Sequence, residues 1–158
     1  MRRPPLLHMC ALGQVLVDRD GGAVEMREQA RARLTSGPAP LSVAEREDQR
    51  YLISDLLDDL DGCQDPDELI FIADRLLISV CELVLSEKRV WLGHGKWLLR
   101  RLRDADSTVC RQLLTGYRQL VASGDSVVLR QAAEVVLNRS GGRLMEGYWR
   151  DGARKIRQ

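Results

Sequence analysis

Four aspartates, Asp55, Asp58, Asp59 and Asp61, stand close together near the end of a predicted helix. Asp55 and Asp59 are four residues apart, so they share one face of that helix. Carboxylates in the C-terminal half of a helix oppose its dipole, so stability does not explain their position. One interpretation is that one of them faces a cleft, either as a general base or as the acceptor of a cationic group, with Asp58 as a candidate substrate-binding residue. The alternative is a solvated face whose like charges are relieved by nearby arginines.

A second group of candidate residues is basic and lies around two glycines, Gly93 and Gly95. Lys96 follows Gly95 at the predicted start of a helix, where exposed amides and a positive dipole end favour phosphate. The P-loop pattern is not met, because Val90 and Trp97 stand where it needs glycine and serine or threonine. The candidate substrate-binding residues here are Lys96, Trp97 and Arg100. The alternative is a helix junction in which Trp91 and Trp97 pack into the core and the bases pair with acids.

Two shorter patterns also suggest chemistry. Arg89 and His94 form an R-x4-H pattern, which resembles the active-site motif of the HEPN ribonucleases, although Gly93 precedes the histidine. Asp18 and Asp20 form a D-x-D of the kind that binds Mg²⁺ in nucleotidyl transfer. No glycine-serine loop precedes that pair, so we interpret it as a turn and predict no metal site.

Charge is distributed unevenly, although the formal net charge of the 158 residues is only +1. Residues 42–87 hold thirteen acids and three bases, a net charge of −10, whereas residues 88–103 hold six bases and no acid. Because the net charge of the whole chain is so small, nucleic acid is not expected as a partner. The four cysteines lie far apart without zinc-site spacing, which favours a reducing, cytoplasmic location. No apolar run is long enough for a membrane span.

The chain divides into three predicted segments. Residues 1–41 hold a short strand at 15–17, alone or in a hairpin with 6–11, then a helix over 23–34 and a linker. Residues 42–140 hold five helices, the first opened by a Ser42–Glu45 capping box and the second by an Asp65 cap. Residues 141–158 form a basic tail. We expect an all-α fold, an antiparallel bundle of about five helices with a short N-terminal strand or hairpin, and helix 66–87 at its centre.

The order of several segments resembles the C-terminal half of bacterial nucleotidyltransferases of the kanamycin or aminoglycoside type, over roughly residues 6–148. In these enzymes a small α/β catalytic domain precedes a helical bundle. The segments that carry the resemblance are Leu6-Leu7-His8-Met9-Cys10, Gly13, Val15-Leu16-Val17-Asp18-Arg19-Asp20-Gly21, Asp55-Leu56-Leu57-Asp58-Asp59 and Trp91-Leu92-Gly93-His94-Gly95-Lys96-Trp97-Leu98.

The resemblance implies a helical domain that closes over an acceptor substrate and supplies a carboxylate base, for which Asp55 and Asp59 are the candidates. The glycine-serine motif and paired aspartates that hold Mg²⁺ and a nucleotide triphosphate in the family are missing here. The chain alone is therefore expected to be inactive and to bind neither, unless a separate catalytic nucleotidyltransferase subunit supplies them. Self-association through residues 6–17 is the other expected partnership. The alternatives are a dimeric, antitoxin-like helical interaction module without catalysis and a HEPN-type ribonuclease.

Overall fold

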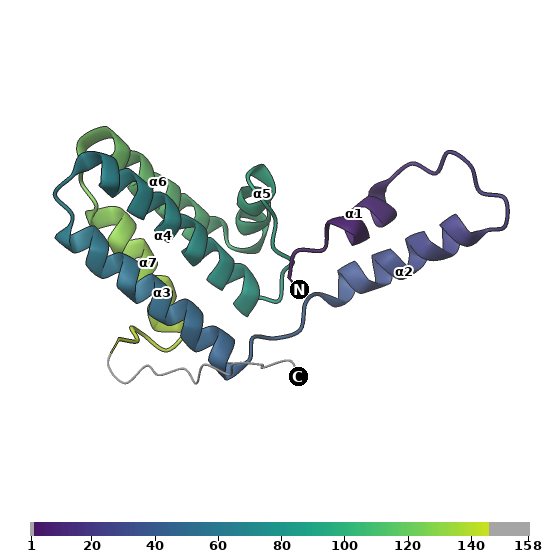
Figure 1. Cartoon of the computed structure of the whole chain (residues 1–158), viewed down its shortest axis with the longest axis horizontal. Helices are drawn as coiled ribbons and strands as arrows, with labels where there is room; N and C mark the ends of the chain where they lie inside the picture. Colours follow the sequence, from purple (N-terminus) through teal and green to yellow (C-terminus); the bar gives the residue numbers. More distant parts are fainter. Residues whose placement is uncertain (1, 146–158) are drawn as a thin grey trace, which may run out of the picture.

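The computed structural model describes residues 2–145, and within this range it contains helices and no strand (Figure 1). The prediction of an all-α fold is confirmed. The helices are α1 (Pro5–Leu12), α2 (Gly22–Ser36), α3 (Val43–Gly62), α4 (Pro66–Glu87), α5 (Lys96–Ala105), α6 (Ser107–Ser123) and α7 (Val127–Arg139).

Helices α3 to α7 share one apolar core, and we call residues 41–140 the helical body. Helix α4 contacts each of the other four helices of the body, as its apolar residues on nearly every side predict. Its C-terminal half is the most deeply placed part, with Val80, Leu83 and Leu85 fully buried. Helices α6 and α7 pack closely because Gly116 of α6 lies against the backbone of Leu129.

The helix starts of the body follow local rules. Ser42 accepts a hydrogen bond from the Glu45 amide at 3.2 Å, and the Glu45 carboxylate accepts one from the Ser42 amide at 2.8 Å, so the predicted capping box is present. The hydrogen bond from the Ser42 backbone is the main reason that the pKa of Glu45 is lowered. Asp65 caps α4, and Asp106 caps α6 by accepting from the Val109 amide at 3.0 Å.

The N-terminal segment differs from the prediction. Residues 5–12 form α1 and not a strand, and residues 15–17 belong to the connection between α1 and α2. A strand at 15–17 would need a partner strand, which the described residues do not provide, whereas Pro5 presets the first turn of a helix. The small residues Ala11 and Ala30 are buried where the two helices meet. The result is a helical hairpin that projects from the body (Figure 1); we call residues 5–36 the arm.

The chain after α7 returns to α3. The Arg50 guanidinium donates to the carbonyls of Gly141 at 2.6 Å and Gly142 at 2.8 Å. The buried Ser54 hydroxyl accepts from the Leu144 amide at 3.0 Å. The first residues of the predicted basic tail are thus attached to the body, and residues 146–158 of that tail lie outside the described residues.

Replacing Gly116 by alanine should destabilise the body, because the added Cβ would lie 2.3 Å from the Leu129 nitrogen. Forcing α6 and α7 apart is an overpacking change, which costs about 1–3 kcal/mol. Gly62→Ala is the matched control, since a Cβ there meets nothing within 4 Å. Urea unfolding should give a lower midpoint for Gly116→Ala only, and equal midpoints would contradict the close packing of α6 on α7.

Candidate functional site

The acid group is on the outer surface of α3. Asp55, Asp58, Asp59 and Asp61 are all exposed, and none of them lines a hollow found in the described part of the chain. The side-chain carboxylates of Asp55 and Asp59 make no hydrogen bond or ion pair with another residue within 2–145. No contact joins α3 to α5, so the acid group and the predicted Lys96, Trp97 and Arg100 are not brought together in one site.

Arginines contact two of the four acids. The Arg143 guanidinium lies 2.5 Å from Asp58 Oδ1 and 2.5 Å from Glu134 Oε1, and the Glu134 contact is the main reason that the pKa of Arg143 is raised. Asp61 pairs with Arg130 at 3.4 Å. For Asp58 and Asp61 the structure therefore shows the solvated, arginine-relieved face that the sequence left open as an alternative.

The basic candidates lie together at the start of α5. The Arg100 guanidinium is 4.8 Å from the centre of the Trp97 ring, a cation–π contact on the surface of the helix. Trp97 is half exposed, so it is not the fully packed core residue of the alternative interpretation. Trp97 also lines a hollow between α5 and the arm.

Two hollows, of about 320 and 360 Å³, share Arg3, Gly93 and His94 on their walls. The first lies among α4, α5 and α6. The second, which we call the groove, lies between α1 and the start of α5. Its wall consists of apolar side chains with four basic residues among them: Pro4, Pro5, Met9, Leu12, Leu92 and Trp97, with Arg3, His8, His94 and Arg101.

A set of charge-assisted hydrogen bonds holds α1 beside the groove. Arg101 of α5 donates to the carbonyls of Trp91 and Leu92, both at 2.6 Å, and to His8 Nε2 of α1 at 2.6 Å. An arginine only donates, so His8 Nε2 accepts, and His8 Nδ1 carries the hydrogen that it donates to the Pro4 carbonyl at 2.9 Å. Burial lowers the pKa of Arg101.

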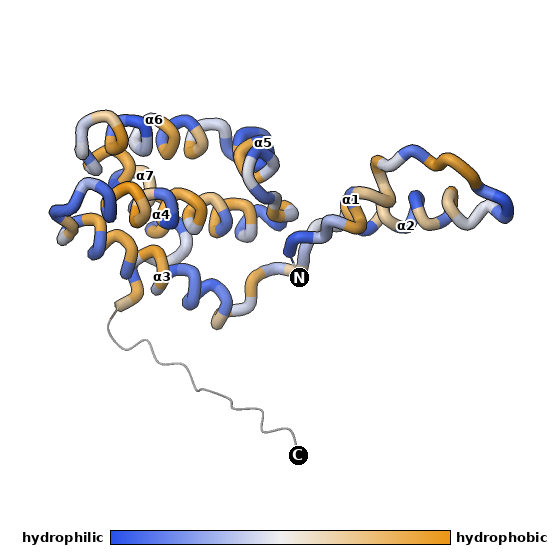
Figure 2. The backbone as a smooth tube through the Cα atoms, turned by 45° about the horizontal axis from the view of Figure 1, so that its top comes forward, coloured by the Kyte–Doolittle hydropathy of each residue, from blue (hydrophilic) through white to orange (hydrophobic). Residues whose placement is uncertain are grey.

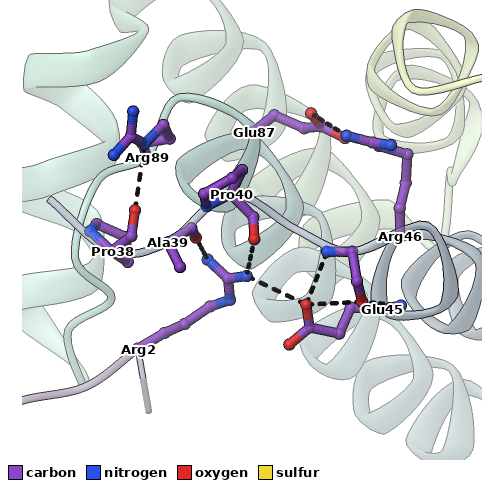
Figure 3. Close-up of polar contacts among 9 residues, drawn as sticks. Arg2, Pro38, Ala39, Pro40, Glu45, Arg46, Glu87 and Arg89 are labelled. Carbon is purple, nitrogen blue, oxygen red and sulfur yellow. Dashed lines mark hydrogen bonds and ion pairs between the residues drawn. The ribbon is translucent and has the colours of Figure 1, made fainter.

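The second attachment is also at the base of the arm, where residues 34–41, at the C-terminal end of α2 and after it, meet the loop after α4 (Figure 1). Arg2 donates to the carbonyls of Ala39 at 2.6 Å and Pro40 at 3.2 Å, and Arg89 donates to the Pro38 carbonyl at 3.2 Å (Figure 3). Trp91 Nε1 donates to the Leu34 carbonyl at 2.9 Å. We call this region, residues 2–4, 34–41 and 87–94 with Arg101, the junction.

Gly37 is needed at the junction for two reasons. Its φ of +70° lies in the region that side chains disfavour, and a Cβ there would lie 2.5 Å from the Arg89 carbonyl oxygen. Arg89 itself has a φ of +55°. The close approach of these two backbones sets where the arm leaves the body.

The D-x-D pattern lies just before the start of α2, and the R-x4-H pattern lies in the loop between α4 and α5. Asp18 accepts from the amides of Ala23 and Val24 at 3.3 Å each, and Asp20 accepts from the Gly22 amide at 3.2 Å, so both carboxylates bond to backbone at the start of α2. No cluster of three or more acidic, histidine or cysteine side chains fit for a metal occurs within residues 2–145. Of the R-x4-H pair, Arg89 is bound to the 36–38 backbone and His94 lines both hollows.

Sequence reasoning did not single out Arg3 or His8, and it placed Arg101 only within the basic run at 88–103. Arg3 pairs with Glu82 of α4, and the other two bond to each other across the groove. Their spacing carries no motif, because 93 positions separate His8 from Arg101. The bases at 88–103 indicate a basic surface. Only the packing of the arm on the loop before α5 shows that Arg101 is the base that contacts the arm through His8.

None of the helices within residues 2–145 has the length and apolar content to cross a bilayer. Comparison of the chain with protein-family models, with curated proteins and with solved structures finds no match.

Replacing Arg101 by methionine should loosen α1 from the body, because two backbone carbonyls and His8 lose their shared donor. Hydrogen bonds to a charged group are worth about 1.5–3 kcal/mol each, so amide exchange over residues 6–12 should accelerate by about tenfold or more. Arg103→Met is the matched control, since Arg103 is exposed on the same helix. Unchanged exchange of these amides in Arg101→Met would contradict the role of Arg101.

The buried thiol of Cys81 on the wall of the first hollow should resist alkylation. Burial is the main cause that raises its pKa to about 12, so at pH 8.5 it stays protonated and the thiolate nucleophile is scarce. Cys10 and Cys63 are partly exposed and should be modified first by iodoacetamide. Peptide mass spectrometry measures the order in which the cysteines are alkylated. Early alkylation of Cys81 in the folded protein would contradict the prediction and show that the first hollow opens.

Proposed function

We propose that this chain is a protein-interaction module that associates with a second copy of itself, and that the arm is its docking element. The observation that carries the proposal is the arm's exposed apolar surface. Eight of its large apolar side chains are exposed: Leu6, Met9, Leu12, Val15, Leu16, Val17, Val24 and Met26. Contiguous apolar surface on a folded protein marks an interaction site. Figure 2 shows an apolar stretch in the connection between α1 and α2, at the end of the arm away from the body.

The burial pattern of the arm supports the proposal. Ala11 and Ala30 are its buried residues, so the contact between α1 and α2 has little apolar area of its own. A short helical hairpin with so small a core is marginal in water. Covering one exposed leucine or methionine fully contributes about 1.5–3 kcal/mol before the cost of association. A partner on the arm would therefore stabilise both the complex and the arm.

The charges of the arm are compatible with a second copy as the partner. Residues 5–36 hold four acids and four bases, so their net charge is zero. Two arms, or an arm and another part of the chain, can therefore approach without like-charge repulsion. The acidic surface of residues 42–87, with a net charge of −10, would oppose pairing with itself.

Three further predictions concern the helix arrangement, the cellular location and the nucleotidyltransferase resemblance. We propose that the helical body is an antiparallel bundle and that the protein is cytoplasmic, which its four free cysteines support. The nucleotidyltransferase resemblance stays a prediction, with a catalytic subunit as the other possible partner of residues 6–17. The helical conformation of residues 5–12 favours the interaction module, because part of that resemblance lay in a strand at the edge of a catalytic domain.

Sedimentation velocity across the micromolar range tests the proposal. The weight-average mass of the wild-type protein should rise with concentration, and a Leu16→Ser/Val17→Ser variant should associate more weakly because it loses the apolar end of the arm. These side chains are 86% and 72% exposed, so the fold is kept, as circular dichroism would check. Val121→Ser/Val127→Ser, two exposed changes on the body, is the control. A wild-type protein that stays monomeric throughout would refute the proposal.

A further inference from the structure

The chain's single phenylalanine is on the surface. Phe71 lies near the start of α4 with its side chain 80% exposed, although the second half of the same helix is core. Asp67, Glu68 and Asp74 are exposed and lie one helical turn away on either side. Arg75 is the base among these neighbours. Phe71 is thus an aromatic anchor on a mostly acidic surface.

The groove has the complementary character. Its volume of about 360 Å³ is within the range of about 300–1,000 Å³ of sites that enclose small ligands, so an aromatic ring has room there. Met9, Leu12 and Trp97 supply apolar wall, and each is at least half exposed, so they lack a cover. His94 and Arg101 are basic residues of the same wall, and Lys96 and Arg100 follow on α5.

We infer that Phe71 of one copy of this chain inserts into the groove of another. The inference rests on the proposed function and names the surface of the second copy that covers the base of the arm. Its basis is charge complementarity, because an apolar anchor among acids faces an apolar groove among bases. The same polarity holds over longer segments, with a net charge of −10 over residues 42–87 and +6 over residues 88–103.

The positions of the anchor and the groove fit a head-to-tail contact. Phe71 lies near the N-terminal end of α4, and the groove is built from α1, the start of α5 and the loop that follows the C-terminal end of α4. These two ends of α4 face away from each other along the body (Figure 1). In the proposed arrangement each copy offers its anchor and its groove to two different neighbours, and such a heterologous association gives open chains or a ring.

Arm-to-arm pairing is the alternative that the experiment must separate. It would use the same exposed residues of the arm, form a two-fold dimer and leave Phe71 free. The two arrangements respond differently when two variants are mixed, because only a heterologous contact has distinct halves that can complement each other.

The test uses Phe71→Ala, which removes the anchor, and Met9→Glu, which places a carboxylate on the groove wall. Both positions are exposed, so both variants should fold, and Val121→Glu on α6 is the matched control. Each variant alone should associate roughly tenfold or more weakly than the wild type in sedimentation velocity. The control should associate as the wild type does.

An equimolar mixture of the two variants should then form a 1:1 dimer that does not grow. The Phe71→Ala copy keeps its groove, and the Met9→Glu copy keeps its Phe71, so one functional contact remains. Phe71→Ala associating like the wild type, or a mixture as weakly associated as its components, would overturn the inference. In that case, association that still requires Leu16 and Val17 would leave the proposed function in place, whereas a monomeric wild type would overturn both.

Discussion

The position of α1 on the body depends on the hydrogen bonds that the Arg101 guanidinium makes with protein acceptors. Partial burial removes some of its water and lowers its pKa, and three acceptors replace that water: the carbonyls of Trp91 and Leu92 and the His8 ring. A cation is costly to bury unless it is hydrogen-bonded. The loop before α5 and the first helix of the arm must therefore stay together, and the groove is the space that they leave between them.

The two parts of the molecule are stabilised in different ways. The helical body has a continuous apolar core, in which α4 is surrounded and Gly116 lets α6 approach α7. The arm has two buried alanines and is held mainly by polar bonds at the junction, from Arg2, Arg89 and Trp91 as well as Arg101. Hydrogen bonds fix the direction of the arm but leave its apolar side chains exposed. This difference is the physical reason for proposing that a second copy completes the structure.

Much of the body could be predicted from sequence, because its signals are local. Ser42 with Glu45, and Asp65 with Pro66, each mark a helix start within four residues, and the apolar periodicity of residues 66–87 predicts a central helix. The strand at 15–17 was wrong because Val15-Leu16-Val17 has strand-forming side chains but no neighbouring strand among the described residues, and tertiary context overrides propensity.

The candidate site was harder to predict. The acid group was visible in the sequence, but its exposure depends on how α3 packs in the body. The pairing of Asp58 with Arg143 joins residues 85 positions apart, because the chain after α7 returns to α3. Lys96, Trp97 and Arg100 were found as a group, and Trp97 does line the groove. Arg3 and His8 had no signal, and nothing set Arg101 apart from the other bases of 88–103, since the three come together only when the arm packs against the body.

Hydrogen exchange measured at low and high protein concentration tests the central claim, that the arm is covered by a second copy, most directly. The account predicts that amides of α1 and of the first turns of α4 become more protected as the concentration rises, while those of α6 and α7 do not change. Exchange of α1 that is independent of concentration, across a range in which the protein stays folded, would contradict it.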